Sequence, residues 1–520
     1  MNRERKTFRE PAVVAMSFTF KTRRTFAAIL LAMNTAHDDS SPRTAGGSSP
    51  DGRSLSTSPH RWPPGPPTPL TGWGLIVQMS RDLLGTLAQW QRSYGDVVHL
   101  RLWPEHEVVV CDPYLVRELL VKHRDAHIRW ERSTRVFGHM LGHSVFVAEG
   151  DAWQRKRQAL HPSFSAKAVQ AFVKTIASAT TQALSRWPSA SGKAETRPAH
   201  DWPIESEITS LTMDVILRLL FSSEVGDDAR QAEHDVHACL AAANAEFYWP
   251  ASWPDWMPWK REKRRALAAL RRLIDHHIAQ RLAQPARTWP DDLLTRLLHL
   301  HRADPAGWPL EAVHSECLTI FVAGHETTAA TLTWWAWCMA SNPGAQAAAR
   351  AEVEQVLQGH APEAEGIGSL RYLVQTIEET LRLHPAAPVL LTRRLVQPVD
   401  LGPWHLPART MVLLPVQLMH HDSRWFPDPH TFRPERFGPD APEIPRGAWM
   451  PFGAGPRVCL GQHLAMTEMT VIAAQLLQRF ELSVPPGTNA PEPVLAVSLR
   501  PKEPLRLRVT RRDRIDGASR

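Results

Sequence analysis

Apolar and polar positions along this chain follow two periods, and each period predicts a different kind of element. Apolar residues at helical spacing predict helices over three stretches: 73–94, 113–123 and most of 165–300. Short runs that alternate apolar and polar residues predict strands near both ends of the chain: 96–102, 107–111, 480–484, 494–499 and 505–509. The last three runs are predicted to form a β hairpin. The pattern therefore indicates a mainly helical protein with a smaller β-rich part.

Residues 309–341 predict one long helix of roughly 48 Å. Pro309 suits a first helical turn, and Asn342-Pro343 ends the helix because a residue before proline disfavours the α conformation. The middle reads Ala323-Gly324-His325-Glu326-Thr327-Thr328, which is polar in an otherwise apolar helix. Thr327 can bond the carbonyl of Ala323, and Gly324 leaves space on the face that Thr327 shares. Such local rule-breaking is expected at functional sites, and a satisfied helix kink is the alternative.

A glycine-rich loop near the C-terminus presents a single cysteine. It reads Phe452-Gly453-Ala454-Gly455-Pro456-Arg457-Val458-Cys459-Leu460-Gly461 and runs directly into a predicted helix from His463 onward. The glycines allow backbone angles and close approaches that side chains forbid. The positive end of the following helix favours a thiolate on the cysteine. A flat, bulky partner could sit against this loop, whereas the plainer alternative is a buried cysteine in an ordinary loop.

The other cysteines narrow the chemistry further. The chain has five cysteines, which are scattered, odd in number and without a CxxC pair. This pattern argues against a disulfide framework or a zinc site and is typical of a reducing cytosol. The protein is therefore expected to be cytoplasmic.

Charge lies mainly in the two tails. Of the formal net charge of +7, residues 1–60 carry nine Lys/Arg against five Asp/Glu, and residues 511–520 carry four Arg against two Asp. A nucleic-acid partner is not expected, since that requires a basic face on the fold itself. Residues 1–60 are predicted to be a disordered extension and 511–520 a disordered basic tail. The apolar run 26–33 is too short to span a bilayer, so membrane association is the minority interpretation.

Two further motifs lie between these tails, in a region with no internal linker that we predict to be one domain, 61–510. Trp153 and Arg157 are four residues apart and share one helix face, which alone suggests only a basic surface helix. Glu379 and Arg382 are three apart on another predicted helix and can form an ion pair.

Taken together, the cysteine loop, the polar centre of the long helix and these two motifs resemble the cytochrome P450 family, most closely its soluble bacterial members. The resemblance covers about 61 to 510. It implies a mainly α fold with a smaller β-rich subdomain, and heme b held between the long helix and the cysteine loop with its following helix. Cys459 would then be the axial ligand of the heme iron, in a signature that includes Phe452 and Gly453.

The resemblance also implies roles for other residues. Trp153, Arg157 and Arg457 would contact the heme propionates, and either Arg393 or Arg394 would reach the second propionate. Thr327 would donate a hydrogen bond to dioxygen, and Glu326 would belong to the proton-delivery path. A structural trio would tie the helix to the segment before the cysteine loop: Glu379, Arg382 and Arg436.

The activity implied is that of a monooxygenase inserting one atom of dioxygen into a small lipophilic substrate. Electrons would come from a separate donor, a ferredoxin or flavodoxin with its reductase, because no room follows residue 510 for such a domain. Docking is expected on a basic face formed by Arg155, Lys156, Arg446 and Arg457. The alternatives are a peroxide-using peroxygenase and a non-catalytic heme sensor or electron carrier, and the Glu326-Thr327 pair argues against both. Neither the substrate nor the redox partner's identity is predicted.

Overall fold

The computed structural model describes residues 62–512, except 69–70, 188–200, 224–227 and 249–255. The predictions for residues 1–60 and for 513–520 fall outside this part of the chain.

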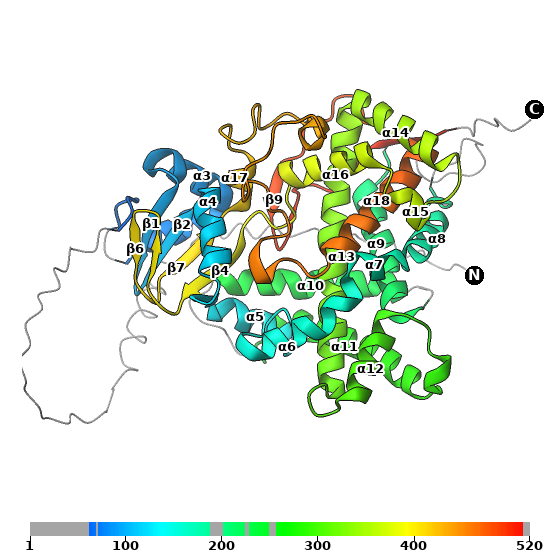
Figure 1. Ribbon diagram of the computed structural model, residues 1–520, viewed down its shortest axis with the longest axis horizontal. Coiled ribbons are helices and arrows are strands. Elements are labelled where there is room, and N and C mark those ends of the chain that lie inside the picture. The colour runs from blue at the N-terminus through cyan, green and yellow to red at the C-terminus, as the bar shows by residue number, and fades with distance from the viewer. Residues whose placement is uncertain (1–61, 69–70, 188–200, 224–227, 249–255, 513–520) are drawn as a thin grey trace, which may run out of the picture. The chain divides into compact units, whose positions relative to one another are not determined.

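The long central helix α13 (Leu310–Ser341) has 32 residues and organises the helical part (Figure 1). Side chains are buried around most of its circumference, which is typical of a helix in the middle of a core. It packs against α9, α11, α12, α16 and α18. The helices of this part are α5 (Glu131–Leu141), α6 (Gly150–Leu160), α7 (Ala166–Gln170), α8 (Val173–Leu184), α9 (Ile204–Phe221), α10 (Asp228–Tyr248), α11 (Arg261–Leu282), α12 (Leu293–Ala303), α14 (Pro343–Leu357), α15 (Ala364–Ile367), α16 (Arg371–Leu383) and α18 (Gln462–Arg479).

The β-rich part is built on a five-stranded sheet in the order β1-β2-β7-β4-β3. The β2–β7 pair is parallel and the other pairs are antiparallel. Alternation along β1 buries both faces, since Val97 packs in one apolar cluster and Val98 and Leu100 pack in another with α3. The strands are β1 (Val97–Leu102), β2 (Glu105–Val110), β3 (His127–Arg129), β4 (Leu390–Leu395) and β7 (Met411–Leu414); a small ribbon of β5 (Val399–Leu401) and β6 (Trp404–Leu406) and the short helix α17 (Val416–His420) complete this part.

The predicted N-terminal helices differ from the observed ones in two places. The stretch 73–94 forms two helices, α2 (Trp73–Arg81) and α3 (Leu83–Tyr94), because Asp82 leaves helical geometry and accepts a hydrogen bond from the Gly85 N–H at 2.9 Å. The predicted helix 113–123 is α-helical only in α4 (Pro113–Arg117) and continues as a π-helical turn over Glu118–Lys122.

The predicted C-terminal hairpin is wrong in its pairing. β8 (Phe480–Ser483) pairs with β11 (Arg508–Arg511), whereas β9 (Pro493–Leu495) pairs with β10 (Leu499–Pro501). Long-range bonds fix β10 elsewhere, since the Leu499 carbonyl accepts from the Trp334 indole at 2.9 Å and its N–H donates to the Ala386 carbonyl at 3.0 Å. β11 also includes Arg511, which was predicted to belong to the disordered tail.

The described helices include none with the length and apolar character needed to cross a membrane.

Candidate active site

The cysteine loop is a tight turn leading into α18. The Cys459 N–H donates to the Phe452 carbonyl at 2.9 Å, closing the loop. Gly453 and Gly455 have φ of +76° and +72°, the left-handed region that favours glycine. A Cβ on Gly455 would also lie 2.2 Å from the Leu120 carbonyl oxygen. The backbone geometry of the loop therefore requires glycine at these two positions, as the sequence predicted.

Cys459 differs from the other four cysteines. It is exposed, whereas Cys111, Cys239, Cys317 and Cys338 are buried. Burial raises the pKa of the Cys239 and Cys338 thiols to about 12, so these remain protonated packing residues. Desolvation by the surrounding protein raises the pKa of the Cys459 thiol, while the Gly461 N–H and the Arg157 charge lower it. A cation facing the sulfur would lower this pKa further and favour the thiolate.

Beside this loop lies a cavity of about 400 Å³ with a strongly basic wall. Its lining includes Ala454, Pro456 and Arg457 of the loop, Trp153 of α6, His127 and Arg129 of β3, and Arg393 of β4. The Trp153 ring lies under the Arg457 guanidinium, 4.0 Å from its centroid. Arg457 donates to the Ala148 carbonyl at 2.9 Å and pairs with Glu149. Arg157 lies on the same helix as Trp153 and is half-buried. Burial lowers its pKa, and a charge on Cys459 would raise it.

Two arginines of this wall, the buried Arg393 and the partly buried Arg129, carry buried donor atoms that no described residue accepts from. These atoms are Arg129 Nε and Nη1 and Arg393 Nε, whereas Arg393 Nη1 donates to the Leu391 carbonyl. The two residues lie directly opposite each other in the β3–β4 pair, where like charges repel. Burial, with the Arg129 charge adding to it, lowers the pKa of Arg393 to about 10, and burial lowers that of Arg457 to about 9. Glu149 of the same cavity offsets part of this repulsion and raises the pKa of all three arginines, but one carboxylate does not balance three guanidinium charges, so the cluster can take a further anionic group.

This geometry separates the two arginines that the sequence left undecided. Arg394 turns to the other side of the sheet, where its Nε donates to Glu131 at 3.1 Å and its Nη2 to Glu105 at 3.0 Å. Arg393 faces the cavity. Arg129 was not predicted as a site residue. It lies on β3, a three-residue strand, and only the pairing of β3 with the distant strand β4 brings it to the cavity.

The polar centre of α13 divides into two sides. Thr327 is exposed, and its hydroxyl donates to the Ala323 carbonyl at 3.1 Å, as expected. Glu326 is buried and is bound by Arg500 and Ser498. No hydrogen bond joins it to Thr327 among the described residues. Gly324 serves a different purpose from the predicted one, since a Cβ there would lie 2.9 Å from the Ile216 side chain of α9.

The structure brings the predicted trio together. Arg382 is fully buried and donates to both carboxylate oxygens of Glu379, at 2.7 and 2.8 Å. Arg436 donates to Glu379 at 3.3 Å. Arg382 also donates to the carbonyls of His420 and Pro429, at 2.8 and 2.7 Å. These bonds hold α16 to the segment that leads into the cysteine loop.

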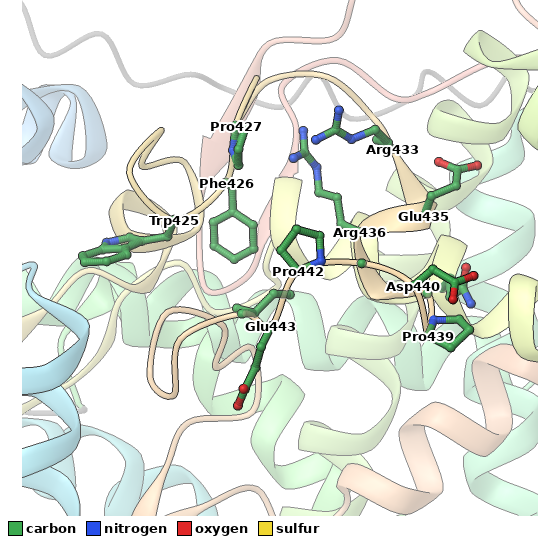
Figure 2. Close-up of a pocket in the computed structure, with 14 residues that line it drawn as sticks. Trp425, Phe426, Pro427, Arg433, Glu435, Arg436, Pro439, Asp440, Pro442 and Glu443 are labelled. Carbon is green, nitrogen blue, oxygen red and sulfur yellow. The ribbon is translucent and has the colours of Figure 1, made fainter.

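Figure 2 shows a second cavity, of about 540 Å³, with Trp425 and Phe426 on one side and Arg433 and Arg436 on the other. Arg436 alone among the predicted site residues lines it, and its guanidinium is already engaged by Glu379 and by the Asp428 carbonyl. This cavity therefore does not carry the site.

One predicted surface charge is not on the surface. Lys156 pairs with the fully buried Glu316 at 2.9 Å and stacks over the Trp308 ring. Its place in a docking face was a wrong prediction, because the amphipathic lysine lies against α13 and not toward solvent.

The family model for cytochrome P450 matches residues 63–509. The chain is 33% identical to cyclooctat-9-en-7-ol 5-monooxygenase of Streptomyces melanosporofaciens, over 79% of this chain and 90% of the relative. It is 30% identical to 11-oxo-beta-amyrin 30-oxidase of Glycyrrhiza uralensis, over 76% and 77%. It is 31% identical to putative cytochrome P450 132 of Mycobacterium tuberculosis, over 78% and 88%.

The chain therefore belongs to the cytochrome P450 family. It is a heme-thiolate monooxygenase with heme b as cofactor, and it uses a substrate, dioxygen and an external electron donor. The predicted family, the mainly α fold with a β subdomain, the cofactor and the activity are confirmed. The peroxygenase and the non-catalytic carrier are not favoured. The exposed cysteine, and the donor atoms of Arg129 and Arg393 that have no acceptor among the described residues, fit a heme with its two carboxylates.

Proposed function

We propose that Cys459 ligates the heme iron and that the basic wall holds the propionates. The observation that carries this assignment is the set of buried guanidinium N–H donors on Arg129 and Arg393 that have no acceptor in the described part of the chain. Arg457, Arg157 and Trp153 add charged and indole donors suited to carboxylates. Phe452 and Gly453 shape the loop under the heme. When bound, a heme with a thiolate ligand supplies the electron density that favours O–O cleavage.

The distal roles follow from α13. The Thr327 hydroxyl, whose single proton is donated to the Ala323 carbonyl in the structure, would leave that bond and donate the proton toward dioxygen instead. Glu326 would supply protons from the buried side of the same helix. Glu379, Arg382 and Arg436 are structural, since their groups are satisfied by one another and by backbone carbonyls. One heme domain over 61–510 would contain all of these residues.

The test is the absorption spectrum of the reduced, carbon-monoxide-bound protein. A thiolate ligand moves the Soret band far to the red. Cys459→Ser should remove that band, whereas the matched variant Cys338→Ser, at a buried packing cysteine, should keep it. If Cys459→Ser retained the band, the ligand assignment would be wrong.

For the substrate we propose a small lipophilic molecule. Two relatives are named for oxidising cyclooctat-9-en-7-ol and 11-oxo-beta-amyrin, and both compounds belong in a panel beside fatty acids, terpenes and aromatics. The spin-state shift on binding ranks the panel. A shift with fatty acids alone would contradict the use of these relatives as guides.

The proposed electron donor is a small acidic ferredoxin or flavodoxin in the cytoplasm. Arg155 and Arg446 are exposed, whereas Lys156 and Arg457 are engaged inside the protein. Reversing the charge of Arg155 and Arg446 should slow reduction more at low salt than at high salt, because exposed charges are screened. If charge reversal slowed reduction equally at low and at high salt, or not at all, this face would be excluded as the docking site.

A further inference from the structure

Glu326 lies at the centre of a buried polar network that joins α13 to two other parts of the chain. Its Oε1 accepts from Ser498 Oγ at 2.7 Å and from Arg500 Nε at 2.8 Å. Its Oε2 accepts from Arg500 Nη2 at 2.6 Å. Arg500 is also bound to Glu205 of α9 at 3.3 Å. The carboxylate is thus held by Arg500 of the strand β10 and by Ser498, the residue before that strand.

These contacts make Glu326 a poor reservoir of protons by itself. Burial alone would raise its pKa, but Arg500, followed by His237 and His325, lowers it below the usual value. At neutral pH the group is therefore ionised and must receive each proton from a neighbour before it can pass one on. Arg500 cannot be that neighbour, since a guanidinium does not give up its proton in this range.

His237 of α10 is placed to be that neighbour. Its Nδ1 lies 3.9 Å from Glu326 Oε2, within ion-pair distance but beyond hydrogen-bond distance, and 39% of its side chain is exposed. It therefore lies between solvent and the buried carboxylate. The other imidazole here, His325, is fully buried, and burial lowers its pKa to about 4, so it stays neutral.

The groups that face His237 come from several elements. Burial, the largest cause, lowers the pKa of His237 below its ordinary value; the Glu326 carboxylate opposes this shift, and the charges of Arg500 and His234 add to it. His325 of α13 meets its ring edge-to-face at 6.5 Å. Glu205 of α9 pairs with Arg500 at 3.3 Å. An imidazole set between a carboxylate and solvent can take a proton from water and release it again.

We propose that His237 is a positioning residue for the monooxygenase reaction, which passes protons from solvent to Glu326. In each step the protonated imidazole gives its Nδ1 proton to Glu326 Oε2. The neutral ring then takes a proton from water, so one proton moves inward and no electrons are exchanged. This inference rests on the proposed role of Glu326 in proton delivery.

The first experiment measures turnover and coupling of electron consumption to product in the heme-loaded enzyme. His237→Gln should lower coupled turnover by about tenfold, less than the 10²–10⁴-fold expected for a group acting directly on the reacting atoms. KM, heme content and melting temperature should stay unchanged, and the solvent isotope effect should rise. Wild-type turnover should decline as pH rises through the pKa of His237, and His237→Gln should lose this decline. His234→Gln, one turn away and 60% exposed, is the matched control. It should keep wild-type coupled turnover and shift the pH profile only slightly upward, because it removes a positive charge that lowers the pKa of His237.

The second experiment does not depend on activity. Diethyl pyrocarbonate acylates a histidine in its neutral form and not in its protonated form. Its reaction rate at His237 is followed by peptide mass spectrometry at a series of pH values. The pH dependence of that rate reports the pKa of the ring. Glu326→Gln should lower this pKa by about 0.7 unit or more, the effect of losing a unit charge at 3.9 Å even in a water-like dielectric.

The outcomes separate the two claims. If Glu326→Gln keeps full coupling, the proposed role of Glu326 fails. If Glu326→Gln is impaired but His237→Gln matches wild type at every pH, only the role of His237 is overturned. An unchanged pKa of His237 in Glu326→Gln, or a loss of turnover matched by lost heme or a lower melting temperature, also overturns it.

Discussion

Replacing Arg393 by methionine is expected to weaken heme retention while it stabilises the heme-free chain. The change keeps an unbranched side chain of similar length. It removes a buried charge whose Nε finds no acceptor among the described residues, together with one bond from Nη1 to the Leu391 carbonyl. The opposite signs arise because the charge is unfavourable in the protein alone and favourable beside a carboxylate.

Both magnitudes can be worked out from the structure. Burial lowers the pKa of Arg393 from its ordinary value to about 10, which corresponds to about 3 kcal/mol against the charged form in the fold. The sign is that of a depressed basic group: the penalty is present at neutral pH and is relieved only as pH rises past about 10. Methionine removes it, so the heme-free chain should gain up to about 3 kcal/mol. The heme-bound protein loses a charged hydrogen bond worth about 1.5–3 kcal/mol, or about 10–100-fold in heme affinity.

Heme retention is measured by transfer of heme to an excess of a heme-free globin, followed by absorbance. Stability of the heme-free chain is measured by urea denaturation of protein prepared without heme. Arg394→Met is the matched control, because Arg394 is bound by Glu105 and Glu131 on the other side of the sheet. It should lower stability modestly and leave heme transfer unchanged. Equal heme loss from both variants, or a less stable heme-free Arg393→Met, would refute the reasoning.

Three further results are expected. Thr327→Ala should keep the heme spectrum and uncouple electron consumption from product, because it removes the hydroxyl that holds the distal proton; full coupling would contradict the role. Arg382→Met should lower the free energy of unfolding by about 3–5 kcal/mol and Arg424→Met by at most about 1 kcal/mol, because Arg382 is fully buried and Arg424 is 49% exposed. Both losses are measured by pulse proteolysis in urea. Equal losses would mean that burial of the ion pair does not set its contribution. Burial without a charged partner raises the pKa of Glu468 well above 4.5, so native stability should fall as pH rises from that value. Glu468→Gln should therefore unfold at higher urea than wild type at pH 8 and at the same urea at pH 4, and a constant difference would argue against a titrating Glu468.

The sequence by itself determined the elements and motifs that depend on interactions between residues close together in the chain. The limits of α13 follow from Pro309 and Asn342-Pro343, which act on the backbone directly. The glycines of the cysteine loop follow from its positive φ angles, and the Glu379–Arg382 pair follows from helical spacing. These features need no knowledge of distant residues, which is why the sequence predicted them and the cytochrome P450 family together.

The tertiary structure decided which charged groups face one another. Arg393 and Arg394 are adjacent in sequence and point to opposite faces of β4, so only the pairing with β3 shows which one meets Arg129 at the cavity. In the same way, Lys156 reads as a surface charge until α13 places Glu316 beside it. Glu326 reads as a free acid until β10 and α10 bring Arg500 and His237 to it. Electrostatic partners from distant segments are set by packing and strand register, which local periodicity does not encode.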